Sequence, residues 1–295
     1  MDPLALSDAA IIALAGSAAF TFVALSWQRL ARTVASNASF PQSILHEAAQ
    51  QIRDRLERQG RRQSLYLHSV LVFALLFGAV YLLRPQPILG QMPNWLAFTL
   101  LGVAAAVGLL GLYRLAAGSV AQSRLRFQHD ASVAVGHGLQ QLSANQNRVF
   151  HDVSCAAGDI DHVIVGLHGI YAVFVVARKP RKDPRVRLNG DQLAFAPGNV
   201  VIPLEDCGRK AERLARECSK HASQAIRVRP VIAVPGWDVD AQSSSQYLVV
   251  NERNLAMMRG WKDSNDYLLN EDVEVIQNLL TERCTRFAGG KSPQR

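Results

Sequence analysis

Three long apolar blocks occupy the first part of the chain. They run from Ala9 to Trp27, from Ser64 to Leu83 and from Trp95 to Leu115. Each is about as long as the roughly 20 residues that an α-helix needs to cross the hydrocarbon core of a bilayer. The pattern therefore predicts a bundle of three transmembrane helices, at about residues 9–27, 64–83 and 95–115, within a membrane region that covers residues 1–118.

A cleaved signal peptide is the competing interpretation of the first block. Signal peptides begin with a basic segment, whereas the residues before Ala9 include Asp2 and Asp8 and no lysine or arginine. We therefore interpret the first block as a retained membrane span.

Arginines are distributed unevenly around the three blocks. The segment before the first block has none, and the connection between the second and third blocks has only Arg84. The connection between the first and second blocks holds Arg29, Arg32, Arg53, Arg55, Arg58, Arg61 and Arg62. By the positive-inside rule this connection is cytoplasmic. The sequence thus predicts a multi-pass protein of the inner cell membrane, with everything after Leu115 in the cytoplasm.

The cytoplasmic connection also contains a predicted helix. Residues Ser43–Gln63 have helical composition and a dense basic side. This side fits either a solvated juxtamembrane helix or one that rests on anionic lipid headgroups.

A hydrophobic hairpin is predicted between Gly158 and Pro180. Side chains alternate from Ile160 to Val165, and after a glycine-containing turn a second apolar run, Ile170–Val176, returns beside the first. Asp161 is therefore a lone acid inside a hydrophobic hairpin.

The remaining elements of the second part follow from similar patterns. Helices are predicted at Ser119–Leu142, Leu204–Ala222, Leu255–Trp261 and Asp266–Phe287. Strands are predicted at Arg148–Val153, near Val186 and Leu193 around an Asn189–Gly190 turn, near Val200, at Val228–Val234 and at Tyr247–Val250. This order predicts an α/β domain over residues 119–288, with a mixed sheet flanked by helices. Residues 289–295 are predicted to be a disordered tail.

The net charge and the cysteine spacing limit the kinds of partner and of metal site that the chain is expected to have. The 295-residue chain has a formal net charge of +8, which indicates an anionic partner such as nucleic acid or the inner leaflet of a membrane. The four cysteines form no CxxC or CxxH pair, which argues against a zinc site and a disulfide framework. We expect them to be reduced and partly buried.

Four segments between about Ala131 and Trp237 carry a family resemblance. They are RVFHDV at Arg148, IDHVIVGLHGIYAV at Ile160, LNGDQL at Leu188 and RPVIAVPGW at Arg229. In this order and spacing they resemble the nuclease-related (NERD) domain of membrane-anchored bacterial proteins, a branch of the PD-(D/E)xK nuclease superfamily. The resemblance implies a restriction-endonuclease-like fold, in which a helix precedes a central sheet that carries the nuclease chemistry.

The resemblance also implies where that chemistry would lie. Family members place a glutamate in the first helix, an aspartate in the IDH segment, and a glutamate and a lysine two residues apart on the next strand. The acids hold Mg²⁺ against the scissile phosphate, and the lysine helps to activate water. The matching positions here are Ser132, Asp161, Phe174 and Val176. Residues two apart on a strand share a face, so Phe174 and Val176 turn the expected metal-and-lysine face into an apolar wall.

Asp161 is then a vestigial catalytic residue, and neither a metal site nor a cofactor is expected. Its alternative role is structural, with the carboxylate accepting backbone N–H groups. Mg²⁺ enters only if the missing ligands have migrated, and the candidates for migration are His137, Lys179, Glu205 and Asp206. Three further histidines, His151, His162 and His168, lie on alternate strand positions and a turn, which is no recognisable zinc triplet.

A basic segment follows the strand that would carry the active site. Its cationic residues are Arg178, Lys179, Arg181, Lys182, Arg185 and Arg187. A nuclease would grip the phosphate backbone here, whereas the alternative interpretation is a solvated hairpin loop.

Three hypotheses for the function follow. The first is a membrane-tethered, catalytically degraded nuclease fold that binds nucleic acid or another anionic cytoplasmic partner. The second is an active Mg²⁺-dependent nuclease with migrated ligands. The third is a structural or assembly module whose basic surface binds anionic lipid. The replaced acid and lysine favour the first and third over the second.

Overall fold

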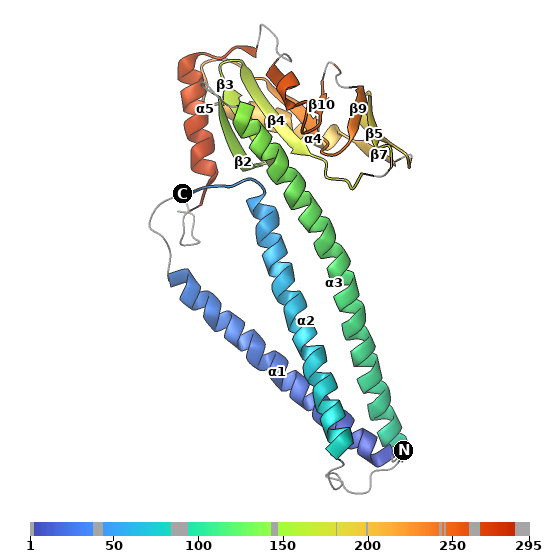
Figure 1. The fold of residues 1–295 in the computed structure, drawn as a ribbon. Helices are drawn as coiled ribbons and strands as arrows, with labels where there is room; N and C mark the ends of the chain where they lie inside the picture. The colour runs from blue at the N-terminus through green and yellow to red at the C-terminus, as the bar shows by residue number, and fades with distance from the viewer. Residues whose placement is uncertain are drawn as a thin grey trace. The chain divides into compact units, whose positions relative to one another are not determined.

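Figure 1 shows the fold of the protein in a computed structural model. The structure describes residues 3–37, 44–83, 94–142, 147–180, 182–198, 200–241, 244, 246–259 and 266–286. The chain divides into two compact units. The first comprises residues 1–40 and 55–124, and the second comprises residues 41–54 and 125–295. The predicted tail at 289–295 lies outside the described residues.

Long helices contain all three apolar blocks. They are α1 (Pro3–Asn37), α2 (Gln50–Leu83) and α3 (Asn94–Leu142). Within the described parts of these helices, one window, Ala10–Trp27, is long and apolar enough to cross a membrane, with a mean hydropathy of 1.9. This finding supports the first of the three predicted spans by length and composition, and the second and third spans stay predictions.

The predicted helix at Ser43–Gln63 is wrong in its first turns. Helix α2 begins at Gln50, and β1 (Ile44–Leu45) pairs antiparallel with β11 (Thr285–Arg286). The backbone amide of His46 also donates to the carbonyl of Cys284, at 2.9 Å. Because this pairing joins the two ends of the second unit, the local composition around Ser43 gave no sign of it.

The centre of the second unit is a five-stranded sheet in the order β10-β8-β4-β3-β2. Its strands are β2 (Arg148–Cys155), β3 (Gly158–Gly166), β4 (Gly169–Val175), β8 (Val228–Ala233) and β10 (Leu248–Val250). Strands β2, β3 and β4 are antiparallel, whereas β8 runs parallel to both β4 and β10. This arrangement confirms the predicted mixed sheet, with the hydrophobic hairpin β3–β4 at its middle.

Four strands form a second sheet, whereas the sequence predicted one mixed sheet. Its order is β7-β6-β5-β9, formed by β5 (Arg185–Asn189), β6 (Gln192–Ala196), β7 (Val200–Pro203) and β9 (Asp238–Ala241). The hairpin β5–β6 confirms the predicted Asn189–Gly190 turn, where Gly190 has a φ of 59°. Strand β9 was missed because its sequence DVDA has no apolar run, and its parallel pairing with β5 joins segments distant in sequence.

Apolar clusters cover both faces of the five-stranded sheet. One cluster joins the sheet to the second sheet and to α4 (Glu205–Ser219) and α5 (Asn270–Arg283). The other joins the sheet to the end of α3 and to the 3-10 helix η1 (Leu255–Arg259). Burial on both faces explains why β4 reads as the continuous apolar run GIYAVFV.

Two of the C-terminal predictions need correction. The described part of the Leu255–Trp261 segment is a 3-10 turn that ends at Arg259, and Trp261 lies outside the described residues. Helix α5 is shorter than the predicted Asp266–Phe287, because the chain after Cys284 pairs with β1 and the segment before Asn270 packs as a loop. In that loop Asp266 forms a buried salt bridge with Arg229 of β8.

Candidate functional site

Asp161 lies in β3, between the central strand β4 and the edge strand β2 of the five-stranded sheet. Its Oδ2 accepts a hydrogen bond from the backbone N–H of Val175 in β4, at 2.7 Å. Burial raises the pKa of this carboxyl to about 6, against which the Val175 N–H acts to lower it. The carboxylate therefore accepts a hydrogen bond from the backbone of the neighbouring strand, as the structural alternative for this residue expects.

Phe174 and Val176 flank Val175 and belong to the core. The side chain of Phe174 is 5% exposed and Val176 packs against the same apolar cluster. His162 pairs with Val173, so Asp161 stands next to Phe174 across the strands. The structure thus brings three of the four family positions together, and two of them are apolar.

Ser132, the fourth position, lies in α3 and does not join them. Its hydroxyl is 3.4 Å from Nε2 of His162, and both side chains are buried. Successive strand residues point to opposite faces, and the charge of Lys210 in α4 acts on Asp161. Ser132 and Asp161 therefore lie over opposite faces of the sheet.

A chain of polar side chains continues from Ser132 across the face of the sheet that α3 covers. Nδ1 of His162 lies 2.8 Å from Nδ1 of His151, and Nε2 of His151 lies 3.2 Å from Nε2 of Gln140. Burial, followed by the nearby His151, lowers the pKa of His162 to about 3, and burial also lowers the pKa of His151. Both rings are thus neutral at pH 7, and one Nδ1 donates to the other because a contact of this length needs one donor.

His168 lies apart from this pair. Its ring packs edge-on against Tyr267, with the centroids 5.1 Å apart. Across the part of the chain that the structure describes, no three His, Cys, Asp or Glu side chains are grouped so that they could hold a metal ion.

A pocket of about 650 Å³ opens beside the histidine pair, on the face covered by α3. Its polar lining includes His46, Arg53, His129, His137, Gln140 and His151. His137, one of the candidates for a migrated ligand, therefore belongs to this pocket, where its Nε2 is 3.0 Å from Gln141. Asp161 is not among the residues that line it.

The sequence did not single out Asp152, which is a buried acid. This residue of β2 has a φ of 51°, and its Oδ2 accepts a hydrogen bond from the backbone N–H of Gln51, at 3.0 Å. Burial raises its pKa. Asp152 thus fastens the start of α2 to the edge of the sheet, and no sequence pattern predicted its left-handed backbone.

Helix α4 brings charged groups to the face of the sheet on which Asp161 lies, opposite the face covered by α3. Lys210 Nζ is 2.9 Å from Oδ2 of Asp206, and its charge acts to lower the pKa of Asp161. Cys207 lies in the same region, where burial raises the pKa of its thiol to about 11 and keeps it protonated. Of the candidate migrated ligands, Asp206 is linked to Asp161 through Lys210, and Glu205 is exposed on the first turn of α4. Asp206 and Lys210 are four residues apart and so share one face of the helix, and this spacing could have drawn attention to Lys210 in the sequence.

These residues do not fit the magnesium ion that the family resemblance implies. Mg²⁺ needs carboxylate oxygens in near-octahedral geometry. At the matched positions the structure offers one carboxylate, already bonded to a backbone N–H, beside two apolar side chains. The matched positions therefore support no metal-dependent step.

The basic segment is divided by the fold. Arg178 is half-buried, with its guanidinium 5.4 Å from the ring centroid of Phe195 and its carbonyl bonded to Trp237 Nε1. Lys179 and Lys182 are exposed, and Arg181 lies outside the described residues.

Arg185 and Arg187 belong to β5 rather than to the loop. Arg185 pairs with Asp238 of β9, and Arg187 Nη2 is 3.7 Å from Oδ2 of Asp240. Acids of β9 therefore stand beside both strand arginines. Lys179 and Lys182 are the exposed cations described in the loop after the C-terminal end of β4.

The segment that carries these positions is similar to a known domain family. No curated protein and no solved structure gives a significant match to the chain. The family model described as the nuclease-related domain, NERD, matches residues 128–235, from α3 to the residues that follow β8. Residues 128–235 of this chain are therefore identified as a nuclease-related domain.

Proposed function

We propose that this protein is a membrane-anchored nuclease-related domain that binds nucleic acid in the cytoplasm without cutting it. The three apolar blocks serve as membrane spans, and the arginines after the first block hold the domain on the cytoplasmic side.

One observation carries the proposal that the domain does not cut. Phe174 and Val176 occupy the positions where the family resemblance expects an acid and a lysine, and both pack in the core. Asp161 remains, but its carboxylate is half-buried, has a raised pKa and accepts a hydrogen bond from the Val175 N–H. One such carboxylate, already bonded to a backbone N–H and beside two apolar side chains, makes a poor site for a divalent cation.

The surface after β4 supports a phosphate-bearing partner. Lys179 and Lys182 are exposed there, at the carboxyl end of the strand that carries the nuclease positions. Lysine side chains bind phosphates as point charges and contribute affinity without reading sequence. The expected interaction is therefore electrostatic and independent of base sequence.

An active nuclease with migrated ligands is the second candidate, and Lys210 favours it. This lysine reaches the side of the sheet where Asp161 lies, and it also pairs with Asp206. In such an enzyme Asp161 and Asp206 would hold the cation, and Lys210 would stand in for the missing strand lysine.

Cleavage assays on the full-length protein in detergent separate the two candidates. We expect no cutting of DNA or RNA in the presence of Mg²⁺ or Mn²⁺, and no difference between the wild type and the Asp161→Asn or Lys210→Met variants. Metal-dependent cleavage that both substitutions abolish would overturn the proposal and establish the second candidate. The Asp159→Asn variant, which changes an exposed neighbouring acid, is the matched control.

A further inference from the structure

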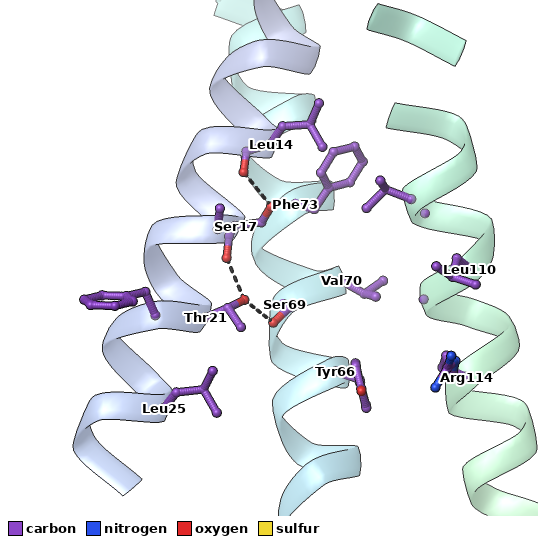
Figure 2. A pocket seen from close by; sticks show the side chains of 15 residues that line it. Leu14, Ser17, Thr21, Leu25, Tyr66, Ser69, Val70, Phe73, Leu110 and Arg114 are labelled. Carbon is purple, nitrogen blue, oxygen red and sulfur yellow. Dashed lines mark hydrogen bonds between the residues drawn. The ribbon is translucent and has the colours of Figure 1, made fainter. Parts of the chain in front are cut away.

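A groove of about 720 Å³ lies among the three helices of the first unit (Figure 2). Fifteen residues from α1, α2 and α3 line it, and all of them belong to that unit. Figure 2 shows Leu14 and Phe73 toward one end, and Leu25, Tyr66 and Arg114 toward the other.

The serine and threonine hydroxyl groups in the wall are already bonded within the protein. Ser17 donates to the carbonyl of Leu14 at 3.0 Å, and Thr21 donates to the carbonyl of Ser17 at 2.7 Å. The hydroxyls of Thr21 and Ser69 lie 2.9 Å apart and link α1 to α2. The middle of the groove therefore offers a ligand mainly apolar contacts.

Arg114 is the one charged residue among the fifteen that line the groove. It is exposed, and within the described part of the chain it forms no salt bridge. Tyr66 lies at the same end and contributes a phenolic hydroxyl. An arginine fork next to a hydroxyl is suited to a phosphate group.

The length of the groove matches one leaflet of a bilayer. Its lining on α1 runs from Leu14 to Leu25, which is about 16 Å at 1.5 Å per helical residue. The hydrocarbon core of a bilayer is about 30 Å thick, so one leaflet is about 15 Å deep. The Arg114 end adjoins the arginine-rich connection, which positive-inside topology assigns to the cytoplasm.

We propose that this groove is a binding site for one anionic phospholipid of the cytoplasmic leaflet. An acyl chain lies along the apolar wall, and the headgroup phosphate contacts Arg114 and Tyr66. The inference rests on the proposed membrane anchorage. A lipid fits better than a peptide segment because the wall is apolar along its length and cationic at one end, as a phospholipid requires.

Two glycines of α3 allow a matched test of the groove. A Cβ atom added at Gly108 would meet no atom within 4 Å, and the same holds for Gly102. Gly108 lines the groove, whereas Gly102 does not. Gly108→Leu therefore fills the groove without a clash at the backbone, and Gly102→Leu makes the same change on the same helix outside it.

The experiment uses the full-length protein in phosphatidylcholine nanodiscs that contain a trace of a lipid with a photoreactive acyl chain. The probe is either phosphatidylglycerol or phosphatidylcholine, and labelled peptides are quantified by mass spectrometry. We expect Gly108→Leu to reduce labelling of α1–α3 by both probes severalfold, while Gly102→Leu leaves it unchanged. Arg114→Gln should lower the preference for phosphatidylglycerol about fivefold, while Arg124→Gln, an exposed arginine of the same helix, leaves it unchanged.

Extraction of membranes with alkaline carbonate distinguishes the two levels of the proposal. If the protein stays in the membrane but Gly108→Leu and Gly102→Leu label equally, the groove is not a lipid site, although the anchorage stands. Equal labelling by the two probes in the wild type overturns the choice of an anionic lipid. If carbonate releases the protein, the anchorage fails, and the lipid site fails with it.

Discussion

Asp161 couples the stability of the domain to pH. The pKa of a free aspartate side chain is near 3.8, and in the folded protein burial raises it to about 6. The folded state therefore holds this proton more tightly than the unfolded state does. Its stabilising effect is fully present below about pH 4 and is lost as the pH rises through about 6.

We predict that Asp161→Asn makes the domain more stable at pH 7.5, by up to about 3 kcal/mol, because asparagine keeps the bond to Val175 without a charge. The advantage should vanish near pH 4. The difference in unfolding free energy is measured at each pH by urea unfolding of the full-length protein, with hydrogen exchange of the sheet amides as the readout. An advantage of the same size at both pH values would contradict the role of ionisation.

The histidine pair acts in the opposite direction. The lowered pKa of His162 means that the unfolded state binds more protons below about pH 6.5, so stability falls as the medium is acidified. The Asp161→Asn comparison must therefore be made between variant and wild type at each pH. Asp159→Asn is the control, because this acid is exposed and bonds to Ser154 at 2.8 Å.

At the scale of elements, pairing of strands places acids beside two of the arginines of the basic segment. Strand β9 places Asp238 and Asp240 beside the arginines of β5. The loop between β4 and β5 has only Asp183 among its acids, and its lysines are exposed. The loop rather than β5 is therefore expected to dominate binding to phosphates.

Replacement of Lys179 and Lys182 by serine should weaken binding to a short DNA duplex and flatten its salt dependence. The slope of log K against log salt should become shallower by about 0.9 for each phosphate that the variant no longer neutralises. Fluorescence anisotropy at several salt concentrations measures both quantities.

The control is the double variant Lys220→Ser and Arg227→Ser, which removes the same charge. Arg227 precedes Val228, which pairs with Ile170 at the start of β4, whereas Lys179 follows the other end of that parallel strand. Equal slopes for the two double variants would show that binding follows net charge rather than this loop.

At the scale of the whole molecule, the distribution of arginines predicts the membrane topology of the chain. Seven arginines lie between the first two apolar blocks, and only Arg84 lies between the second and third. We predict that a reporter inserted in the connection at residues 84–93 is external and that one fused after Leu115 is cytoplasmic. Alkaline phosphatase and green fluorescent protein fusions measure the two locations. An external reporter after Leu115 would overturn the topology and the proposed access to nucleic acid.

Much of the fold was predictable because short-range patterns report burial. The apolar run of β4, the Asn189–Gly190 turn and the amphipathic helix α4 were all predicted at nearly their observed positions. The positions Phe174 and Val176 could be placed in the core for the same reason, since a strand buried on both faces is apolar throughout.

The sequence by itself determined the apolar blocks, the central hairpin and the apolar replacement of the nuclease positions, because each depends on residues close together in the chain. Only the tertiary structure decided which distant groups meet. The pairings of β1 with β11 and of β9 with β5, the contact of Ser132 with His162, and the approach of Lys210 to Asp161 all join segments far apart in sequence. Such contacts leave no periodic signal, because their partners are chosen by the packing of the whole domain rather than by neighbours along the chain.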